Sequence, residues 1–235
     1  MRTAIAILAL SLAPPSHARD KLLRVPSVGC PSGGMTGLQP APTVIKPHWV
    51  EGKFAGELAY YSPGDIGVFA PRGWHCAAVY GSSGAGLIVV PSKRSAESFR
   101  RLSHTAIRGP FVWAGTSLGG TSGRGTVMEA IARYFPSHQD FIRKNRELEM
   151  VFGHLPNGPY RSDIIRQRKA EYVRFTTPAW KKGEGTNSLI PADGTAIQGI
   201  RTLVGLRSEP DLWGVDVRLP PNQADLTEAI LANSR

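Results

Sequence analysis

The sequence predicts an α+β fold, in which about four helices pack on one face of a mostly antiparallel sheet. The chain of 235 residues contains 26 glycines and 19 prolines. This is about a fifth of all residues against roughly 12% in average proteins, which indicates many turns and excludes a helix bundle or a coiled coil. Segments with strand character flank a helical middle section, the order typical of α+β proteins. An apolar content of 41% is enough for a core, and the length favours one domain over two.

Residues 1–18 have the three-part pattern of a secretory signal peptide. A short positive start precedes an almost unbroken apolar run at 4–13, and Ser16 and Ala18 supply the small residues expected just before a cleavage site. The alternative is a short buried helix. We expect cleavage before Arg19 and a soluble mature chain in the periplasm or outside the cell. No apolar run reaches the roughly 18 residues that a membrane span needs.

Two cysteines, Cys30 and Cys76, remain in the mature chain. In an oxidising compartment we expect them to form one disulfide, and the alternative is two free buried thiols. A bridge between them would stabilise the fold by about 4 kcal/mol in the chain-entropy model.

Residues 19–47 contain five prolines and four glycines, which leave no room for a helix. We expect an extended N-terminal arm that the disulfide tethers to a single globular domain, residues 48–235.

Short strands are predicted first in this domain. Residues 57–90 contain four β-rich runs separated by turn residues, which predicts an antiparallel meander. A further short strand is expected at 111–114.

Helices are expected in the middle of the chain and at its end. Residues 92–104 and 125–135 carry apolar residues at helical spacing. Ser137 and Asp140 match a capping box that would open a helix reaching about Glu149, and Asn222 is expected to cap a short final helix.

The last third returns to strands, at 170–177, 196–204 and 211–219. The third of these alternates most clearly, because Val215 and Val217 flank Asp216. This pattern predicts a strand with one face in the core and the other face in solvent.

Gly115–Gly119 matches the G-x-S-x-G pattern of a nucleophile elbow, with Ser117 as the candidate catalytic nucleophile. A strand before it and a helix after it fit this interpretation, and His138 or His154 could act as the base. The alternative is a chance match in a chain rich in glycine and serine. The helix also starts later than an elbow requires, and the chain lacks repeated strand–helix units.

The same glycine-rich loop could instead hold an anion. Backbone N–H groups of Gly123 and Gly125, at the start of a helix, favour phosphate or carboxylate, and Arg124 adds a forked donor. No lysine follows in the P-loop position. The alternative is a turn that binds no ligand.

Arg72 and Trp74 are residue types that dominate binding surfaces. The alternative places Trp74 as a cap on the core beside the disulfide.

Two basic stretches, residues 93–108 and 161–174, each carry five Lys or Arg side chains. They are either solvated faces or parts of a surface that binds a polyanion.

The mature chain has a formal charge of +9, since the full chain has +10 and the leader removes Arg2 and no acid. We expect an exported binding or inhibitor-type protein whose ligand is an anionic envelope component or an acidic protein partner. A serine hydrolase using Ser117 and a structural envelope protein are the alternatives, and the motifs favour binding over catalysis. Electrostatic contact with a membrane surface stays open.

Metal, cofactor and genomic nucleic acid are not predicted as ligands. The five histidines of the mature chain include no pair at the helical i, i+4 spacing of a metal site. No cofactor-binding or nucleic-acid-binding motif stands out in the sequence.

Overall fold

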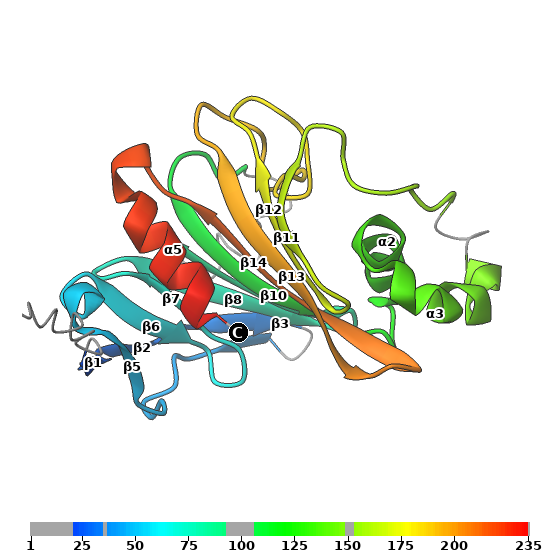
Figure 1. Ribbon diagram of the computed structural model, residues 1–235. Coiled ribbons are helices and arrows are strands. Elements are labelled where there is room, and N and C mark those ends of the chain that lie inside the picture. The colour runs from blue at the N-terminus through cyan, green and yellow to red at the C-terminus, as the bar shows by residue number, and fades with distance from the viewer. Residues whose placement is uncertain (1–20, 35–36, 93–105, 149–152, 235) are drawn as a thin grey trace, which may run out of the picture.

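The computed structural model describes residues 21–34, 37–92, 106–148 and 153–234. The fold is sheet-rich, with one large mixed sheet and few helices, as expected of an α+β protein (Figure 1). The predicted signal peptide lies outside the described residues, and so does nearly all of the helix predicted at 92–104.

A nine-stranded sheet forms the centre of the molecule, in the order β11-β12-β13-β14-β10-β9-β8-β3-β4. Its neighbouring strands are antiparallel except for β3 and β8, which are parallel. Its strands are β3 (Ser32–Gly34), β4 (Gly37–Gln39), β8 (His75–Gly81), β9 (Gly84–Val90), β10 (Phe111–Ser117), β11 (Ile164–Arg168), β12 (Tyr172–Thr177), β13 (Ile197–Leu206) and β14 (Glu209–Arg218).

Two smaller sheets lie beside it. One has the order β2-β6-β7 and the other pairs β1 with β5. Residues of the predicted N-terminal arm thus form four short strands, and each pairs within one of the three sheets. The strands of the small sheets are β1 (Leu22–Val25), β2 (Ser27–Gly29), β5 (His48–Glu51), β6 (Leu58–Ser62) and β7 (Val68–Pro71).

The prediction of one meander over 57–90 is wrong, because its strands divide between two sheets. β6 pairs with β7 in the three-stranded sheet, whereas β8 pairs with β9 in the nine-stranded sheet. Every residue of β7 is buried. A strand that is covered on both faces does not belong to the simple two-faced meander that the turn spacing suggested.

The disulfide between Cys30 and Cys76 is confirmed, with a Cα–Cα distance of 5.3 Å. Cys30 is fully buried and lies between β2 and β3, where the chain passes from the three-stranded sheet to the nine-stranded sheet. The bridge therefore joins this crossing point to β8.

The described helices cover both faces of the large sheet, so the prediction of four helices on one face is wrong. The first helix of the middle section packs against Leu203 and Leu212, and the C-terminal helix packs against Ile200 and Val215. Side chains alternate along a strand, so these two pairs point to opposite faces. Figure 1 shows the two helical regions on either side of the sheet. The described α-helices are α2 (Arg124–Tyr134), α3 (Gln139–Lys144) and α5 (Ala224–Asn233).

The helix predicted from Ser137 to about Glu149 is shorter in the structure. α3 ends at Lys144, and the Ser137 hydroxyl donates to the Ala170 carbonyl instead of capping the helix. Asn222 lies in a 3₁₀ turn, Pro221–Gln223, just before α5. None of the helices that the structure describes is long and apolar enough to cross a membrane.

Candidate functional site

A row of three glycines leaves a trough in the sheet face that carries α2. Gly86, Gly115 and Gly214 lie opposite one another on β9, β10 and β14, and Arg201 on β13 is next in the same row. We call the three the glycine row. Glycine within strands marks places where other groups approach the backbone closely.

Two long side chains lie along this trough. A Cβ atom on Gly115 would lie 2.3 Å from the ring of Trp113, and one on Gly214 would lie 3.0 Å from Nη1 of Arg201. The glycine row therefore allows Trp113 and Arg201 to lie flat against the sheet. Between them and α2 a cavity of about 320 Å³ remains, which we call the hollow.

The floor of the hollow is an ionic cluster in which Arg201 joins two carboxylates. Its Nε lies 2.8 Å from Oε1 of Glu184, and Nη1 and Nη2 lie 2.8 Å and 3.0 Å from the two oxygens of Asp216. The remaining two N–H groups donate to the carbonyls of Ile200 and Glu184. All five donors of the Arg201 guanidinium are thus used.

Hydrogen bonds to the Asp163 carboxylate hold the loop that carries Glu184. One oxygen of this carboxylate accepts the Thr177 hydroxyl at 2.7 Å, and the other accepts the Glu184 N–H at 2.9 Å. Thr177 in turn accepts the N–H of Gly185 at 3.1 Å. The Tyr134 hydroxyl lies 3.3 Å and 3.2 Å from oxygens of Asp163 and Glu184. These contacts fix Glu184 before any ligand arrives.

Arg201 pairs with two carboxylates, those of Glu184 and Asp216, and a third carboxylate, that of Asp163, bonds the backbone of Glu184. Burial raises the pKa of Glu184 and of Asp216, and nearby Arg201 opposes the rise. Burial and the two neighbouring carboxylates raise the pKa of Tyr134, so its hydroxyl stays neutral and donates one hydrogen bond. The cluster has more negative than positive groups, and it offers no free donor from Arg201 to an anion.

The walls of the hollow combine aromatic rings and hydroxyl groups. Arg133 forms an ion pair with Glu129 at 2.9 Å, and its guanidinium lies 3.7 Å from the ring centre of Tyr160. These contacts hold Glu129 and Tyr160 in place in the wall of the hollow. Within the described part of the chain, the side chains of Ser117, Thr126 and Trp113 form no hydrogen bond. The hollow thus offers hydroxyl groups and an indole N–H to a ligand.

Ser117, the predicted nucleophile, lines the hollow at the end of β10. No hydrogen bond joins it to a histidine among the residues the structure describes. His138 lines a different cavity with Glu171. His154 lines a third cavity, which shares Thr126 and Glu129 of α2 with the hollow. Ser117 therefore lies in a cavity, as a nucleophile should, but no described histidine is bonded to it as a base.

The loop predicted to hold an anion uses its donors inside the protein. The Gly119 N–H donates to the Asp211 carboxylate at 2.9 Å, and the Gly123 N–H donates to a hydroxyl of the same loop. Arg124 donates to the Gly119 carbonyl at 2.8 Å and to Asn145 at 3.1 Å. An anion at this loop would have to displace these partners. Gly125 is the second helical residue of α2 and lines a separate cavity together with His154.

Trp74 is half-buried and packs against the core cluster that contains Cys30. Its backbone N–H donates to the hydroxyl of Tyr61, which donates to the Pro71 carbonyl at 2.8 Å. Arg72 is exposed. Trp74 therefore fits the alternative interpretation, in which it covers the core beside the disulfide.

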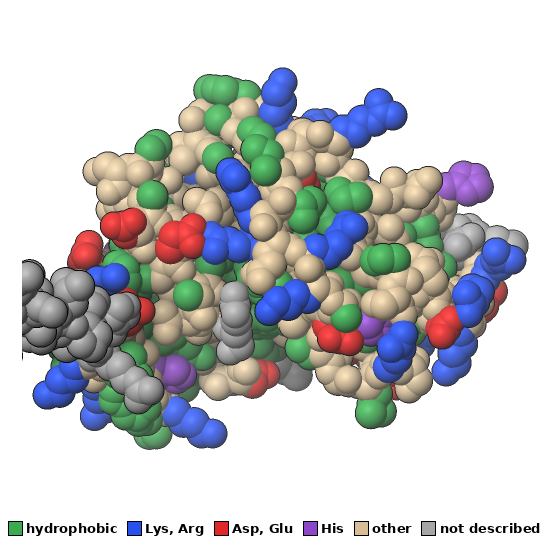
Figure 2. Space-filling model, in the orientation of Figure 1, with side chains coloured by type: hydrophobic (Ala, Val, Ile, Leu, Met, Phe, Trp, Pro, Cys, Tyr) green, Lys and Arg blue, Asp and Glu red, His purple; other side chains and the backbone are tan. Residues whose placement is uncertain are grey.

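The basic stretch 161–174 falls on β11 and β12, whereas most of the stretch 93–108 lies outside the described residues. Arg174, one of the basic residues of the stretch 161–174, forms an ion pair with Glu228 on α5. On the face drawn in Figure 2, Lys and Arg side chains are scattered among acidic and uncharged ones and form no continuous patch.

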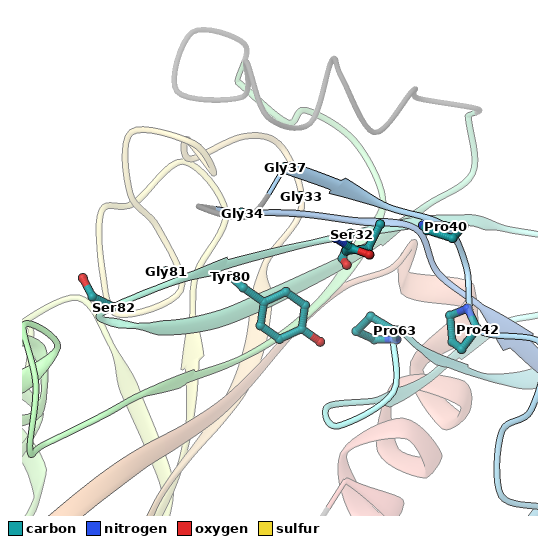
Figure 3. Close-up of a pocket in the computed structure, with 11 residues that line it drawn as sticks. Ser32, Gly33, Gly34, Gly37, Pro40, Pro42, Pro63, Tyr80, Gly81 and Ser82 are labelled. Carbon is teal, nitrogen blue, oxygen red and sulfur yellow. The ribbon is translucent and has the colours of Figure 1, made fainter.

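A wider cavity of about 520 Å³ lies beside β3 and β8 (Figure 3). The lining that the structure describes consists of glycine, proline, serine, one glutamine and Tyr80. The Tyr80 hydroxyl donates to Asp65, and burial together with Asp65 raises its pKa. No charged side chain is in this described lining, so we place the candidate site in the hollow.

No family model, no curated protein and no solved structure matches the chain. The function is therefore argued from the hollow itself.

Sequence reasoning missed Arg201 and Glu184, and it placed Asp216 on the solvent face of its strand. They come from three separate segments, and no motif links them. The available signal was glycine inside the predicted strands, at Gly199 and Gly214, where a side chain from a neighbour lies across the backbone.

Proposed function

We propose that the protein is an exported binding protein and that the hollow holds an uncharged ring bearing hydroxyl groups, such as a sugar unit of an envelope polymer. The observation that carries this proposal is the combination of aromatic rings and hydroxyl groups in the walls of the hollow. Trp113 and Tyr160 offer aromatic surface, and Ser117 and Thr126 offer hydroxyls that form no hydrogen bond with the residues that the structure describes. A sugar ring presents C–H faces and hydroxyl edges, which such walls match.

The charge of the hollow argues for a neutral ligand. Arg201 has no free donor, and Glu184 and Asp216 would repel an anion. The anionic ligand expected from the net charge therefore fits the outer surface better than this cavity.

The size of the hollow supports a small group. Its volume of about 320 Å³ lies near the lower end of the roughly 300–1,000 Å³ typical of ligand sites. One ring, or one unit of a longer chain, fills such a space.

Export is supported by the leader pattern of residues 1–18 and by the disulfide, which is typical of oxidising compartments. An envelope polymer is the hydroxyl-rich material found there.

Titration calorimetry with a panel of neutral sugars, including glucose, galactose and N-acetylglucosamine and their short oligomers, tests the proposal. We expect one member of the panel to bind, Ser117→Ala to weaken the binding, and Trp113→Leu to abolish it. The matched control is Trp213→Leu, because Trp213 lies on the opposite sheet face and bonds the Ser234 carbonyl. Absence of binding across the panel, or equal loss in the two tryptophan variants, would refute the proposal.

A second candidate is hydrolysis by Ser117. One observation favours it, since Ser117 shares the hollow with Glu184 and Asp216, whose pKa values are raised by burial. A carboxylate would then replace histidine as the base. Covalent labelling by an activated phosphonate, lost in Ser117→Ala, would support this candidate. An unlabelled folded protein would exclude it.

A further inference from the structure

Trp180 combines backbone strain with exposure. Its φ of 62° is the only positive value at a non-glycine residue in the described ranges, and 73% of the residue is exposed. A bulky side chain in this conformation costs free energy, and so exposed a side chain recovers little of it by burial. Fold stability alone therefore does not explain a tryptophan here.

The loop between β12 and β13, at the top of Figure 1, holds Trp180 in place. The backbone N–H of Trp180 donates to the backbone carbonyl of Asp193 at 2.8 Å. A Cβ atom on Gly194 would lie 3.2 Å from the indole ring, so the ring rests on the backbone of Gly194. One face of the indole is supported by this contact, while most of the side chain stays open to solvent.

Asp193 anchors this arrangement to the core. Its carboxylate accepts the N–H groups of Thr195 and Gly109 at 3.0 Å and 3.1 Å and lies 3.1 Å from Nη1 of Arg218. Arg218 is fully buried. The indole is therefore presented on a rigid support.

Two cations follow Trp180 directly. Lys181 and Lys182 are exposed, and neither forms an ion pair with a residue that the structure describes. An exposed aromatic ring beside two unpaired lysines can stack a ring and bind a negative charge attached to it.

We propose that Trp180, Lys181 and Lys182 form a second binding site, for an acidic sugar unit such as a uronic acid or a sulfated sugar. The loop that carries them also supplies Glu184, Thr186 and Asn187 to the wall of the hollow. The choice of a sugar rests on the proposed function: a polymer with neutral and acidic units would use both sites. The indole packs against the C–H face of the ring, and the lysines bind its carboxylate or sulfate.

The test measures the affinity of a heparin-derived hexasaccharide, with neutral maltohexaose as the comparison. We expect Trp180→Gly to weaken the affinity for the acidic probe at least about fivefold, in line with the loss of one stacked ring. It should not lower the melting temperature, because glycine accepts the positive φ without strain. Trp180→Phe should keep part of the affinity.

A matched control exists elsewhere in the chain. Trp49 is 50% exposed and lies near Lys46 and Lys53 in the sequence. Lys181→Gln with Lys182→Gln should weaken the acidic probe more than Lys46→Gln with Lys53→Gln, which removes the same charge. Equal losses in the two pairs, or wild-type affinity in Trp180→Gly, would overturn the proposal.

Two further probes distinguish other anionic partners. Tighter binding of vesicles rich in phosphatidylglycerol, or of a single-stranded oligonucleotide, would overturn the assignment to sugar. Loss of neutral-sugar binding in Trp113→Leu reports on the hollow alone. A failure of the Trp180 variants to weaken the acidic probe would therefore leave the proposed function standing.

Discussion

The guanidinium of Arg201 lies across Gly214, the residue directly opposite it on the neighbouring strand. A side chain at Gly214 would occupy the space of the Arg201 side chain, with its Cβ 3.0 Å from Nη1. The ionic cluster under the hollow therefore depends as much on an absent side chain as on the charges themselves.

Arg201→Met should destabilise the protein by about 3–5 kcal/mol, because it leaves Glu184 and Asp216 buried without their cation. Urea unfolding monitored by circular dichroism measures this. The control is Arg174→Met, which removes a partly exposed pair with Glu228 and should cost about 1 kcal/mol or less. Similar losses in the two variants would mean that the cluster does not stabilise the fold.

Gly115→Ala should abolish ligand binding in the hollow, since the added methyl would lie 2.3 Å from the Trp113 ring and displace it. Gly86→Ala is the control in the same row, because its Cβ meets its neighbours at 3.5 Å or more. Calorimetry with the neutral sugar that binds the wild type compares them. Retained binding in Gly115→Ala would show that the position of the ring is unimportant.

Cys30→Ser should lower the stability by up to about 4 kcal/mol, the loop-closure contribution of the bridge to Cys76. Differential scanning calorimetry of the oxidised wild type and of the variant measures the change. Thiol titration of the denatured, unreduced wild type should detect no free thiol, as both cysteines are paired. Two titratable thiols would contradict the bridge.

Stability should fall as the pH drops below about 6.5, the ordinary pKa of histidine. Burial lowers the pKa of His48 and of His138, and the charge of Arg207 lowers that of His138 further, against an opposing effect of Glu171. Both side chains therefore bind protons less readily in the native state than in the unfolded chain, so acid favours unfolding. Melting temperatures from pH 8 to pH 5 should decline less steeply in His138→Gln. An unchanged slope would show that His138 does not contribute to the pH dependence of stability.

Local patterns allowed much of the fold to be predicted. The alternation around Val215 and Val217 located β14, and the pairing of Cys30 with Cys76 followed from cysteine count and compartment. β11 was missed because this edge strand exposes four of its five residues and includes an irregularity in register after Ile165. An exposed polar edge strand leaves no hydrophobic pattern.

The candidate site was missed because a polar strand face usually indicates solvent. Asp216 and Arg218 alternate with buried valines, a pattern that predicts the solvent face of β14. They are 4% and 0% exposed, because the strand has two buried faces and one of them is ionic. Whether a polar face meets water or other charges depends on partners such as Glu184, which approach only in the folded chain.

The final strand of the chain lies in the middle of the large sheet. β14 joins β13 on one side to β10 on the other, and it pairs Phe111 with Arg218 across more than a hundred residues. A chain without its last 30 residues lacks the strand that unites the two halves of this sheet. Loop-closure entropy opposes such distant pairing, so folding is slow and finishes only after the whole chain is available. The topology thus favours a chain that completes its folding only after synthesis has ended.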